Sequence, residues 1–299
     1  MAKAQINFRN EHKASFLAKQ IAQDNNRGSS LENRIETVLN QLRELTGAKS
    51  LKQLDNDKIQ TYIDTLHDKL QSGELKSSTV SSYVSALNRV IEYANEHANT
   101  KLETINAKDY GLSRGSIEYQ NRVVSQDTHN AFKDFLSHKD FLSQQGDIKA
   151  QALQHSIDLQ REFGLRLRES IQIKQDTIKQ AIKDGALHLG RQDGTKNSQP
   201  RDIPIRSEQQ LETLKSALSF MQEHNLRSLA STDTLKEQYH YAEHVRQEFN
   251  QISDTKMDYH GERHYYAQSR LEEGATARQV SEELGHHREE ILKHYIPNL

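Results

Sequence analysis

The sequence predicts a mainly helical protein of two domains, with one small β-sheet in the second domain. Only 3 of the 299 residues are proline and 13 are glycine, so the chain contains few helix breakers. Apolar residues recur at three- and four-residue steps through most of the chain, which is the period of an amphipathic helix. The length is that of two typical domains, each able to bury a core of its own.

Three amphipathic helices are predicted in the first domain. Apolar stripes run through residues 29–45, 57–70 and 78–97, and we interpret them as faces packed into a core. The short polar connections predict antiparallel neighbours, as in a helical bundle. We assign this bundle to residues 29–110. The preceding residues 1–28 are expected to form an arm or an extra helix.

A linker and a second domain follow. Between residues 99 and 126 the apolar periodicity lapses, with glycines among polar residues, and we place the linker at 111–126. The second domain is then 127–299. Its predicted elements are helices at 128–142 and 148–163, short strands at 186–190 and 201–205 joined by a polar turn, and further helices after Ser207.

Composition excludes several classes of protein. Without cysteine there is no disulfide framework, thiolate nucleophile or Cys-ligated zinc. No apolar run approaches the roughly 20 residues that span a bilayer, and the first residues lack a signal peptide's apolar region, so we expect a cytoplasmic protein without a membrane partner. The net charge of −2 does not predict a polyanionic partner. Any nucleic-acid surface must therefore be a local patch.

Basic and hydroxyl side chains concentrate in separated segments of the second domain. These segments are Gly164–Glu169, Gly194–Asn197, His260–His264 and Leu284–His287, followed by Tyr295. Each alone has a structural explanation, such as a surface ion pair or a solvated turn lysine, because short motifs match by chance. Together they suit reaction at a phosphodiester. Arginines bind the phosphate oxygens, histidines and a lysine move protons, and a tyrosine forms a covalent ester.

A metal site is the alternative explanation of the histidines. His260 and His264 lie one helical turn apart, and His286 or His287 would supply a third ligand. The zinc-protease pattern needs a glutamate directly after the first histidine, but here Gly261 follows His260. An arginine at position 263 would also repel a cation. We therefore expect neither a metal nor another cofactor.

The order and spacing of these residues resemble those of the tyrosine recombinases, also called phage integrases. That family's pattern is Gly-Leu-Arg-x-x-Glu, a lysine in a β-hairpin turn, His-x-x-Arg-His, Leu-Gly-His and a tyrosine. The residues that match it are, in order, Arg166 and Glu169, Lys196, His260 with Arg263 and His264, His286, and Tyr295. The steps of 23 residues from Arg263 to His286 and of nine to Tyr295 are also similar to the family's intervals.

The resemblance implies a fold and an activity. The fold is a helical core-binding (SAM-like) bundle followed by an α+β catalytic domain with a small β-hairpin. The activity is site-specific DNA recombination, as in an integrase of a mobile genetic element, through a covalent 3′-phosphotyrosine intermediate and without metal or ATP. The implied partners are double-stranded DNA at specific recombination sites, a homotetramer on that DNA and accessory DNA-bending proteins. The protein would be bacterial or phage-encoded and associated with the nucleoid in the cytoplasm.

The resemblance also implies a role for each matching residue. Tyr295 is the nucleophile, Arg166 and Arg263 bind the non-bridging oxygens, His286 is a further donor, Lys196 protonates the leaving 5′ oxygen, and His260 is a base or orients the phosphate. Glu169 and His264 are supports. Arg168 is the alternative to Arg166, and the Gly-Leu-Arg match favours Arg166.

DNA contacts are predicted at the start of the 78–97 helix, where donors meet a favourable helix dipole. The candidates are Lys76, Ser77, Ser78, Thr79, Ser81 and Ser82. An ordinary solvated helix end is the other interpretation.

Two departures from the family pattern and two alternative functions stay open. Glu262 replaces the usual apolar residue beside Arg263, so its carboxylate either competes for that arginine or needs a partner in the core. Only four residues follow Tyr295, so we expect the family's C-terminal contact between protomers to be missing or made by another element. The alternatives are a type IB topoisomerase-like relaxing enzyme and a non-catalytic DNA-binding architectural or regulatory protein.

Overall fold

A computed structural model describes residues 6–24, 29–113, 119, 121–138, 144–196, 199–231, 234–286, 292 and 295. The chain divides into two compact units, Met1–Ser116 and Ile117–Leu299, and each is described by itself. This division falls within the segment 111–126; the assignment of that segment as a linker stays a prediction. Parts of five predicted regions lie outside the described residues: 1–5 and 25–28, 114–118 and 120, 139–142, 197–198, and, after Ser207, 232–233, 287–291, 293–294 and 296–299.

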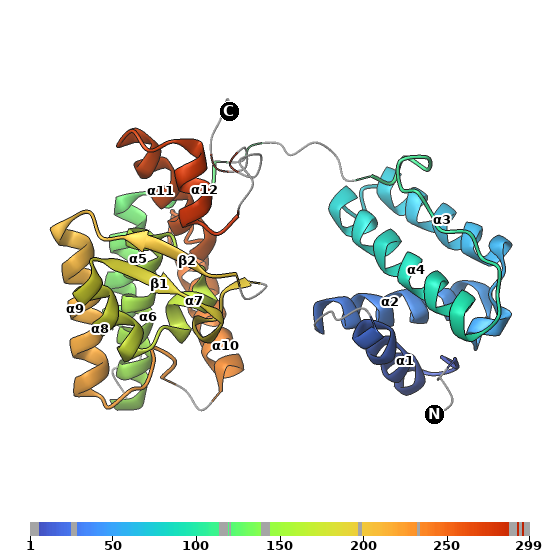
Figure 1. Ribbon diagram of the computed structural model, residues 1–299, viewed down its shortest axis with the longest axis horizontal. Coiled ribbons are helices and arrows are strands. Elements are labelled where there is room, and N and C mark those ends of the chain that lie inside the picture. Colours follow the sequence, from blue (N-terminus) through green and yellow to red (C-terminus); the bar gives the residue numbers. More distant parts are fainter. Residues whose placement is uncertain are drawn as a thin grey trace. The chain divides into compact units, whose positions relative to one another are not determined.

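The first unit is a helical bundle, as the apolar periodicity predicts (Figure 1). Its elements are α1 (Glu11–Asp24), α2 (Ser29–Thr46), the 3-10 helix η1 (Leu51–Gln53), α3 (Asn56–Gln71) and α4 (Ser77–His97). The predicted helices are thus confirmed to within two residues. Helix α1 packs against α2 and α4, and its Leu17 and Ile21 are fully buried in the same core as Leu39 and Leu87. Residues 11–24 are therefore an integral helix of this unit.

The second unit is mainly helical with one small sheet. Its elements are α5 (Gln126–His138), α6 (Gln144–Phe163), α7 (Leu167–Gln172), α8 (Gln175–Asp184), β1 (Ala186–Leu189), η2 (Arg191–Asp193), β2 (Arg201–Pro204), α9 (Glu208–Glu223), α10 (Leu235–Ile252), α11 (Tyr259–Glu272) and α12 (Ala277–Glu283). Strands β1 and β2 pair antiparallel, with Leu189 opposite Arg201. Within the described part of the chain this hairpin is the only sheet, so the predicted fold class is confirmed.

Helix α6 lies at the centre of the second unit. It packs against α5, α7, α9 and α11, and its apolar residues enter two separate clusters. Phe163 joins the cluster around the sheet and α9, whereas Leu153 joins the cluster between α5 and α10. Because α6 contacts both α7 and α11, it brings together two segments that carry predicted site residues and are about a hundred positions apart in sequence.

No helix among the described residues is long and apolar enough to cross a membrane.

Candidate active site

The first site segment is a turn that leads into α7. Gly164 has a left-handed φ of +60°, and a Cβ there would lie 2.5 Å from Cδ1 of Tyr266, so only glycine fits. Arg166 follows as the residue before α7. Its backbone N–H donates to Oε2 of Glu169 at 2.7 Å, and its Nη1 donates to Oε1 at 2.8 Å. Glu169 thus fixes both the backbone and the side chain of Arg166.

A second arginine, Arg201 of β2, binds the same carboxylate. Its Nη1 and Nη2 donate to Oε1 and Oε2 of Glu169 at 2.8 and 2.6 Å in the bidentate geometry of a strong ion pair. Both side chains are buried. Burial by itself raises the pKa of Glu169, but the hydrogen bonds and charge of Arg201, together with Arg166, lower it to about 2.

The sequence reasoning missed Arg201. The available signal was its place in the predicted strand: β2 alternates buried and exposed residues, and Arg201 occupies an inward position. A charged residue at such a position needs a buried partner. Nothing in the sequence shows that this partner is Glu169, 32 positions earlier.

Helix α11 presents the central part of the site. Asp258 precedes the helix, and its carboxylate accepts the backbone N–H of His260 at 3.0 Å, which caps the helix N-terminus. His260, Arg263 and His264 are three and four positions apart and therefore share one face. Arg263 and His264 are buried, whereas His260 is exposed.

Arg263 joins three segments of the second unit. Its side chain is fully buried and donates to the backbone carbonyls of Gly164 and Leu284. Its Nη2 also lies 3.2 Å from Nε2 of His286. Burial, opposed by the neighbouring Tyr295, lowers the pKa of Arg263 to about 10, so the guanidinium keeps its charge at neutral pH.

Tyr295 lies against this group with only 2% of its surface exposed. Its hydroxyl is 3.0 Å from Nε2 of His286 and 3.5 Å from Nε2 of His260. The tyrosine ring packs on His264 with ring centroids 4.3 Å apart. Gln268 donates to the backbone carbonyl of Tyr295 at 3.0 Å. The structure therefore brings Tyr295 together with residues from two of the predicted segments.

The two histidines beside the tyrosine hydroxyl are neutral at pH 7. Burial and the charge of Arg263 lower the pKa of His286 to about 3. His260 has an exposed outer side, but its ring faces the hydroxyl of Tyr295; the loss of water on this inner side and the charge of Arg263 lower the pKa of His260 to about 4. An arginine N–H can only donate, so the acceptor lone pair of His286 is assigned to Nε2 and its proton to Nδ1. The arginine N–H and the tyrosine hydroxyl then share the single lone pair of this nitrogen.

Electrostatics also ties Arg166 to the group, because its charge lowers the pKa values of Arg263, His260 and His286.

Lys196 differs from the other predicted site residues in its contacts. It is exposed in the turn between β1 and β2 and forms no hydrogen bond or ion pair with the described members of the site. Seven of the eight predicted residues are thus linked by contacts or by charge, and Lys196 makes no direct contact with them within the described part of the chain.

Among the described residues, no three His, Asp or Glu side chains are placed to hold a metal ion. His287, a possible third ligand in the metal interpretation, lies outside the described residues.

The predicted DNA-contacting residues lie at the start of α4 in the first unit. Lys76 precedes this helix and makes no side-chain cap. Lys76 and Ser78 are exposed, and the other candidates are half-buried. The hydroxyl of Ser82 donates to the carbonyl of Ser78 at 2.8 Å.

Residues 121–269 match the family model described as Integrase. The match spans Arg166, Lys196, His260 and Arg263. The second unit is a tyrosine recombinase domain of the integrase family. His286 and Tyr295 of the recombinase domain lie beyond the matched residues. A search of curated proteins found no match.

Solved structures of recombinases have a similar fold. The integrase of transposon Tn1549, in complex with transposon right end DNA, aligns with a TM-score of 0.65 at 12% identity over 96% of this chain and 95% of its own. The XerH site-specific recombinase bound to a palindromic difH substrate gives 0.63 at 18% identity over 96% and 80%. A lambda integrase tetramer bound to a Holliday junction gives 0.60 at 13% identity over 93% and 77%. At such identities the likeness concerns the fold.

Proposed function

We propose that this protein is a site-specific DNA recombinase that cuts and rejoins strands through a covalent 3′-phosphotyrosine. One observation carries the proposal: the hydroxyl of Tyr295 lies 3.0 Å from His286, whose same nitrogen is 3.2 Å from the buried Arg263, within a domain of the integrase family. A nucleophile, a proton acceptor and a permanent cation in one group are what attack at a phosphodiester requires.

The proposed reaction conserves the energy of the broken bond. The Tyr295 oxygen attacks phosphorus, the bond from phosphorus to the 5′ oxygen breaks, and the 3′ end stays joined to the tyrosine. The phenolic proton passes to the Nε2 of His286 or of His260, and the leaving 5′ oxygen takes a proton from Lys196. A 5′ hydroxyl from another strand then reverses these steps. No metal or ATP is needed, because the phosphotyrosine ester replaces the phosphodiester bond.

Phosphate binding falls to the arginines. Arg166 is half-buried, and only its Nη1 is held by Glu169, so the rest of its guanidinium is available to an oxygen. The Nε of Arg263 is buried and has no partner among the described residues. A non-bridging oxygen of the phosphate would accept a hydrogen bond from this donor. The negative charge on that oxygen grows in the transition state, so the bond would strengthen there.

The decisive experiment uses a suicide substrate nicked next to the cleavage position, so that the small 5′ fragment diffuses away and the covalent adduct accumulates. We expect a trapped protein–DNA adduct with the wild type and none with Tyr295→Phe, while both bind DNA equally. An equal adduct signal from the two proteins would refute Tyr295 as the nucleophile. Absence of an adduct from both would favour the non-catalytic DNA-binding function.

Product analysis with two site-bearing DNAs tests recombination itself. A recombinase joins strands of different molecules, whereas a topoisomerase-like enzyme reseals the same strand. We expect recombinant products.

The cellular setting that we propose is the bacterial cytoplasm, at the nucleoid, with a homotetramer on DNA and accessory DNA-bending proteins. The tetramer is supported by the similar lambda integrase, whose structure is a tetramer on a Holliday junction.

Lys196 is proposed as the general acid, and a modified substrate tests this role. A sulfur in place of the 5′ bridging oxygen makes a leaving group that needs no proton. We expect Lys196→Ala to slow cleavage of ordinary DNA by about a hundredfold or more and to cleave the sulfur substrate nearly as fast as the wild type. Equal slowing on both substrates would assign Lys196 to phosphate binding instead.

A further inference from the structure

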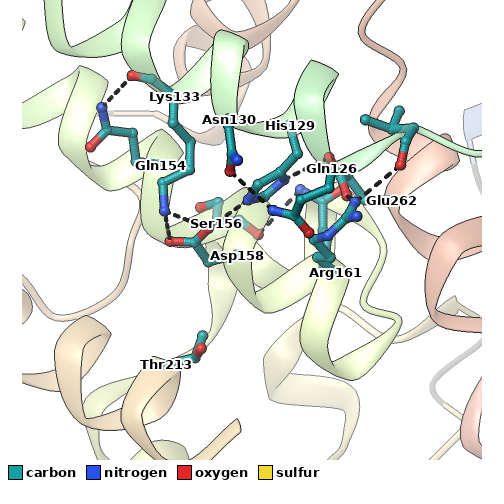
Figure 2. A network of polar contacts seen from close by, with 12 residues as sticks. Gln126, His129, Asn130, Lys133, Gln154, Ser156, Asp158, Arg161, Thr213 and Glu262 are labelled. Carbon is teal, nitrogen blue, oxygen red and sulfur yellow. Dashed lines mark hydrogen bonds and ion pairs between the residues drawn. The ribbon is translucent and has the colours of Figure 1, made fainter. Parts of the chain in front are cut away.

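Glu262 stands beside Arg263 in the first turn of α11, where the family pattern usually has an apolar residue. Its side chain is fully buried. Along a helix, Glu262 points about 100° away from Arg263. The carboxylate accordingly forms its hydrogen bonds with residues of α5 and α6 and does not compete with phosphate for Arg263 (Figure 2).

Four residues complete a charged group that we name the Glu262 anchor: Arg161 and Asp158 of α6 with His129 and Lys133 of α5. Nη1 of Arg161 donates to Glu262 at 2.6 Å, and Nδ1 of His129 lies 2.9 Å from the same carboxylate. Nε2 of His129 is 3.0 Å from Asp158, which Lys133 also binds at 2.7 Å. Both nitrogens of His129 thus face carboxylates, as Figure 2 shows.

Two carboxylates make His129 a donor on both sides. An ionised carboxylate only accepts, so each ring nitrogen carries a proton. Burial lowers the pKa of His129, but the hydrogen bonds to Asp158 and Glu262 outweigh it and raise the pKa above its usual range. The anchor is therefore a chain of charges that alternate in sign from α11 through α5 to α6.

The anchor also fixes the backbone next to α11. Nη1 of Arg161 donates to the carbonyl of Val124 at 3.1 Å, and the N–H of Val124 lies 3.4 Å from the carbonyl of Gly261. A Cβ at Gly261 would lie 2.3 Å from the carbonyl oxygen of Arg122. The guanidinium of Arg161 further stacks over the ring of Tyr265, 3.3 Å from its centroid. The start of α11 is thus held by the carboxylate of Glu262, by the neighbouring backbone of residues 122–124 and by the stack on Tyr265.

We propose that Glu262 is a positioning residue that sets the place of His260 and Arg263 in the active site. The inference rests on the proposed function. Glu262 lies two residues after His260 and one before Arg263, so a shift of the α11 backbone at Glu262 would move both. A displacement of about 1 Å can cost about a hundredfold in rate. A fully buried carboxylate fixed by two donors restricts such movement.

Glu262→Gln is the direct test. The amide keeps the size of the side chain but replaces one acceptor oxygen by a donor facing Arg161 or His129. We expect single-turnover cleavage of the suicide substrate to slow by about tenfold or more, while the Kd for DNA stays within about twofold. Glu212→Gln is the control, because Glu212 is an exposed residue of α9 whose carboxylate pairs with Lys215. We expect it to cleave at close to the wild-type rate, and equal slowing in both variants would overturn the inference.

A matched pair at His129 tests the same contact if Glu262→Gln does not fold. The amide nitrogen of asparagine takes the place of Nδ1, and that of glutamine takes the place of Nε2. His129→Asn keeps the bond to Glu262 and loses that to Asp158; His129→Gln does the reverse. We expect slower cleavage only in His129→Gln, with similar melting temperatures for the two. Equal rates would overturn the role of Glu262.

The wild type separates the two proposals. If it forms no adduct, the proposed function fails. If it forms the adduct and Glu262→Gln forms it at the same rate, only the positioning role fails.

Discussion

The protonation of the histidines beside Tyr295 is set by their surroundings. His286 is half-buried next to Arg263, and these two effects lower its pKa to about 3. Loss of water on the inner side of the His260 ring and the charge of Arg263 lower the pKa of His260 to about 4. Both imidazoles are therefore neutral at physiological pH and can accept the phenolic proton. The phosphate's negative charge would then offset the repulsion by the arginine and stabilise the imidazolium that forms.

The lowered pKa of His286 predicts how the folding stability of the protein depends on pH. Because the folded pKa of His286 lies below the ordinary 6.5, the unfolded chain binds more protons between about pH 6.5 and 3, and stability falls as pH falls through this window. We expect the ¹⁵N shifts of His286 to stay those of a neutral ring at pH 5.5. His286→Gln should show a weaker loss of stability on acidification. A ring that titrates near pH 6.5 would contradict this prediction.

The second prediction for a single residue concerns Glu169, whose carboxylate forms ion pairs with Arg166 and Arg201. Glu169→Gln places an amide donor against Arg201 and leaves a buried guanidinium without its counter-charge. We expect a loss of about 3 kcal/mol in the free energy of unfolding by urea at pH 7. The pKa of Glu169 is about 2, so its stabilisation is complete above the usual 4.5 and lost as pH falls towards 2. The difference between the two proteins should close over that range.

A variant of an exposed carboxylate provides the control. Asp202 is adjacent to Arg201 in β2, but its side chain is exposed and pairs with His188. We expect Asp202→Asn to change stability by no more than about 0.5 kcal/mol. Equal costs for the two variants would show that Glu169 has no special role.

Two turns, rather than the helices alone, hold the guanidinium of Arg263. The turn before α7 supplies the carbonyl of Gly164, and the turn after α12 supplies that of Leu284. The second turn needs Gly285, whose φ is +66° and whose Cβ would lie 3.0 Å from Cδ of Arg201. The glycines of both motifs therefore serve close packing around two arginines.

Gly164→Ala tests this packing, with Gly185→Ala as its matched control. Both glycines have left-handed φ angles, +60° and +73°, but a Cβ at Gly185 would meet nothing within 4 Å. Gly185→Ala should cost only the backbone strain, about 1 kcal/mol. Gly164→Ala adds a clash with Tyr266, so we expect a further loss of about 1–3 kcal/mol and slower cleavage. Thermal unfolding and the suicide substrate measure both, and equal costs would contradict the close packing.

Across the whole molecule, a net charge of −2 means that DNA binding must depend on local cations. Many of the acidic groups are already paired: Glu169 and Glu262 are buried against arginines, and Asp55 binds Lys58. Each such pair also removes one cation and leaves the net charge unchanged, so binding depends on where the remaining cations lie.

The salt dependence of binding tests the proposed contact at Lys76. If this side chain neutralises one phosphate, Lys76→Ala should reduce the slope of log K against log salt concentration by about 0.9. Lys58→Ala is the control, because Lys58 is paired with Asp55, and we expect no change in slope. Fluorescence anisotropy over a salt series measures both. An unchanged slope for Lys76→Ala would assign the start of α4 to an ordinary solvated helix end.

The sequence by itself determined the helices, the hairpin and the family. Periodic burial is a local property, so the stripes of α2, α3 and α4 predicted helices that the structure confirms, and the spacing from Arg263 to Tyr295 is readable without coordinates. The catalytic roles of the site residues stay predictions.

Only the tertiary structure decided which charges meet. The partners of Glu169 and Glu262 include Arg201 and Arg161, 32 and 101 positions away, and no spacing rule connects them. Burial and these pairings set the pKa values of the site as well. The physical reason is that a helix or strand specifies its own inward face, whereas the energy of a buried charge depends on atoms that other elements bring to it.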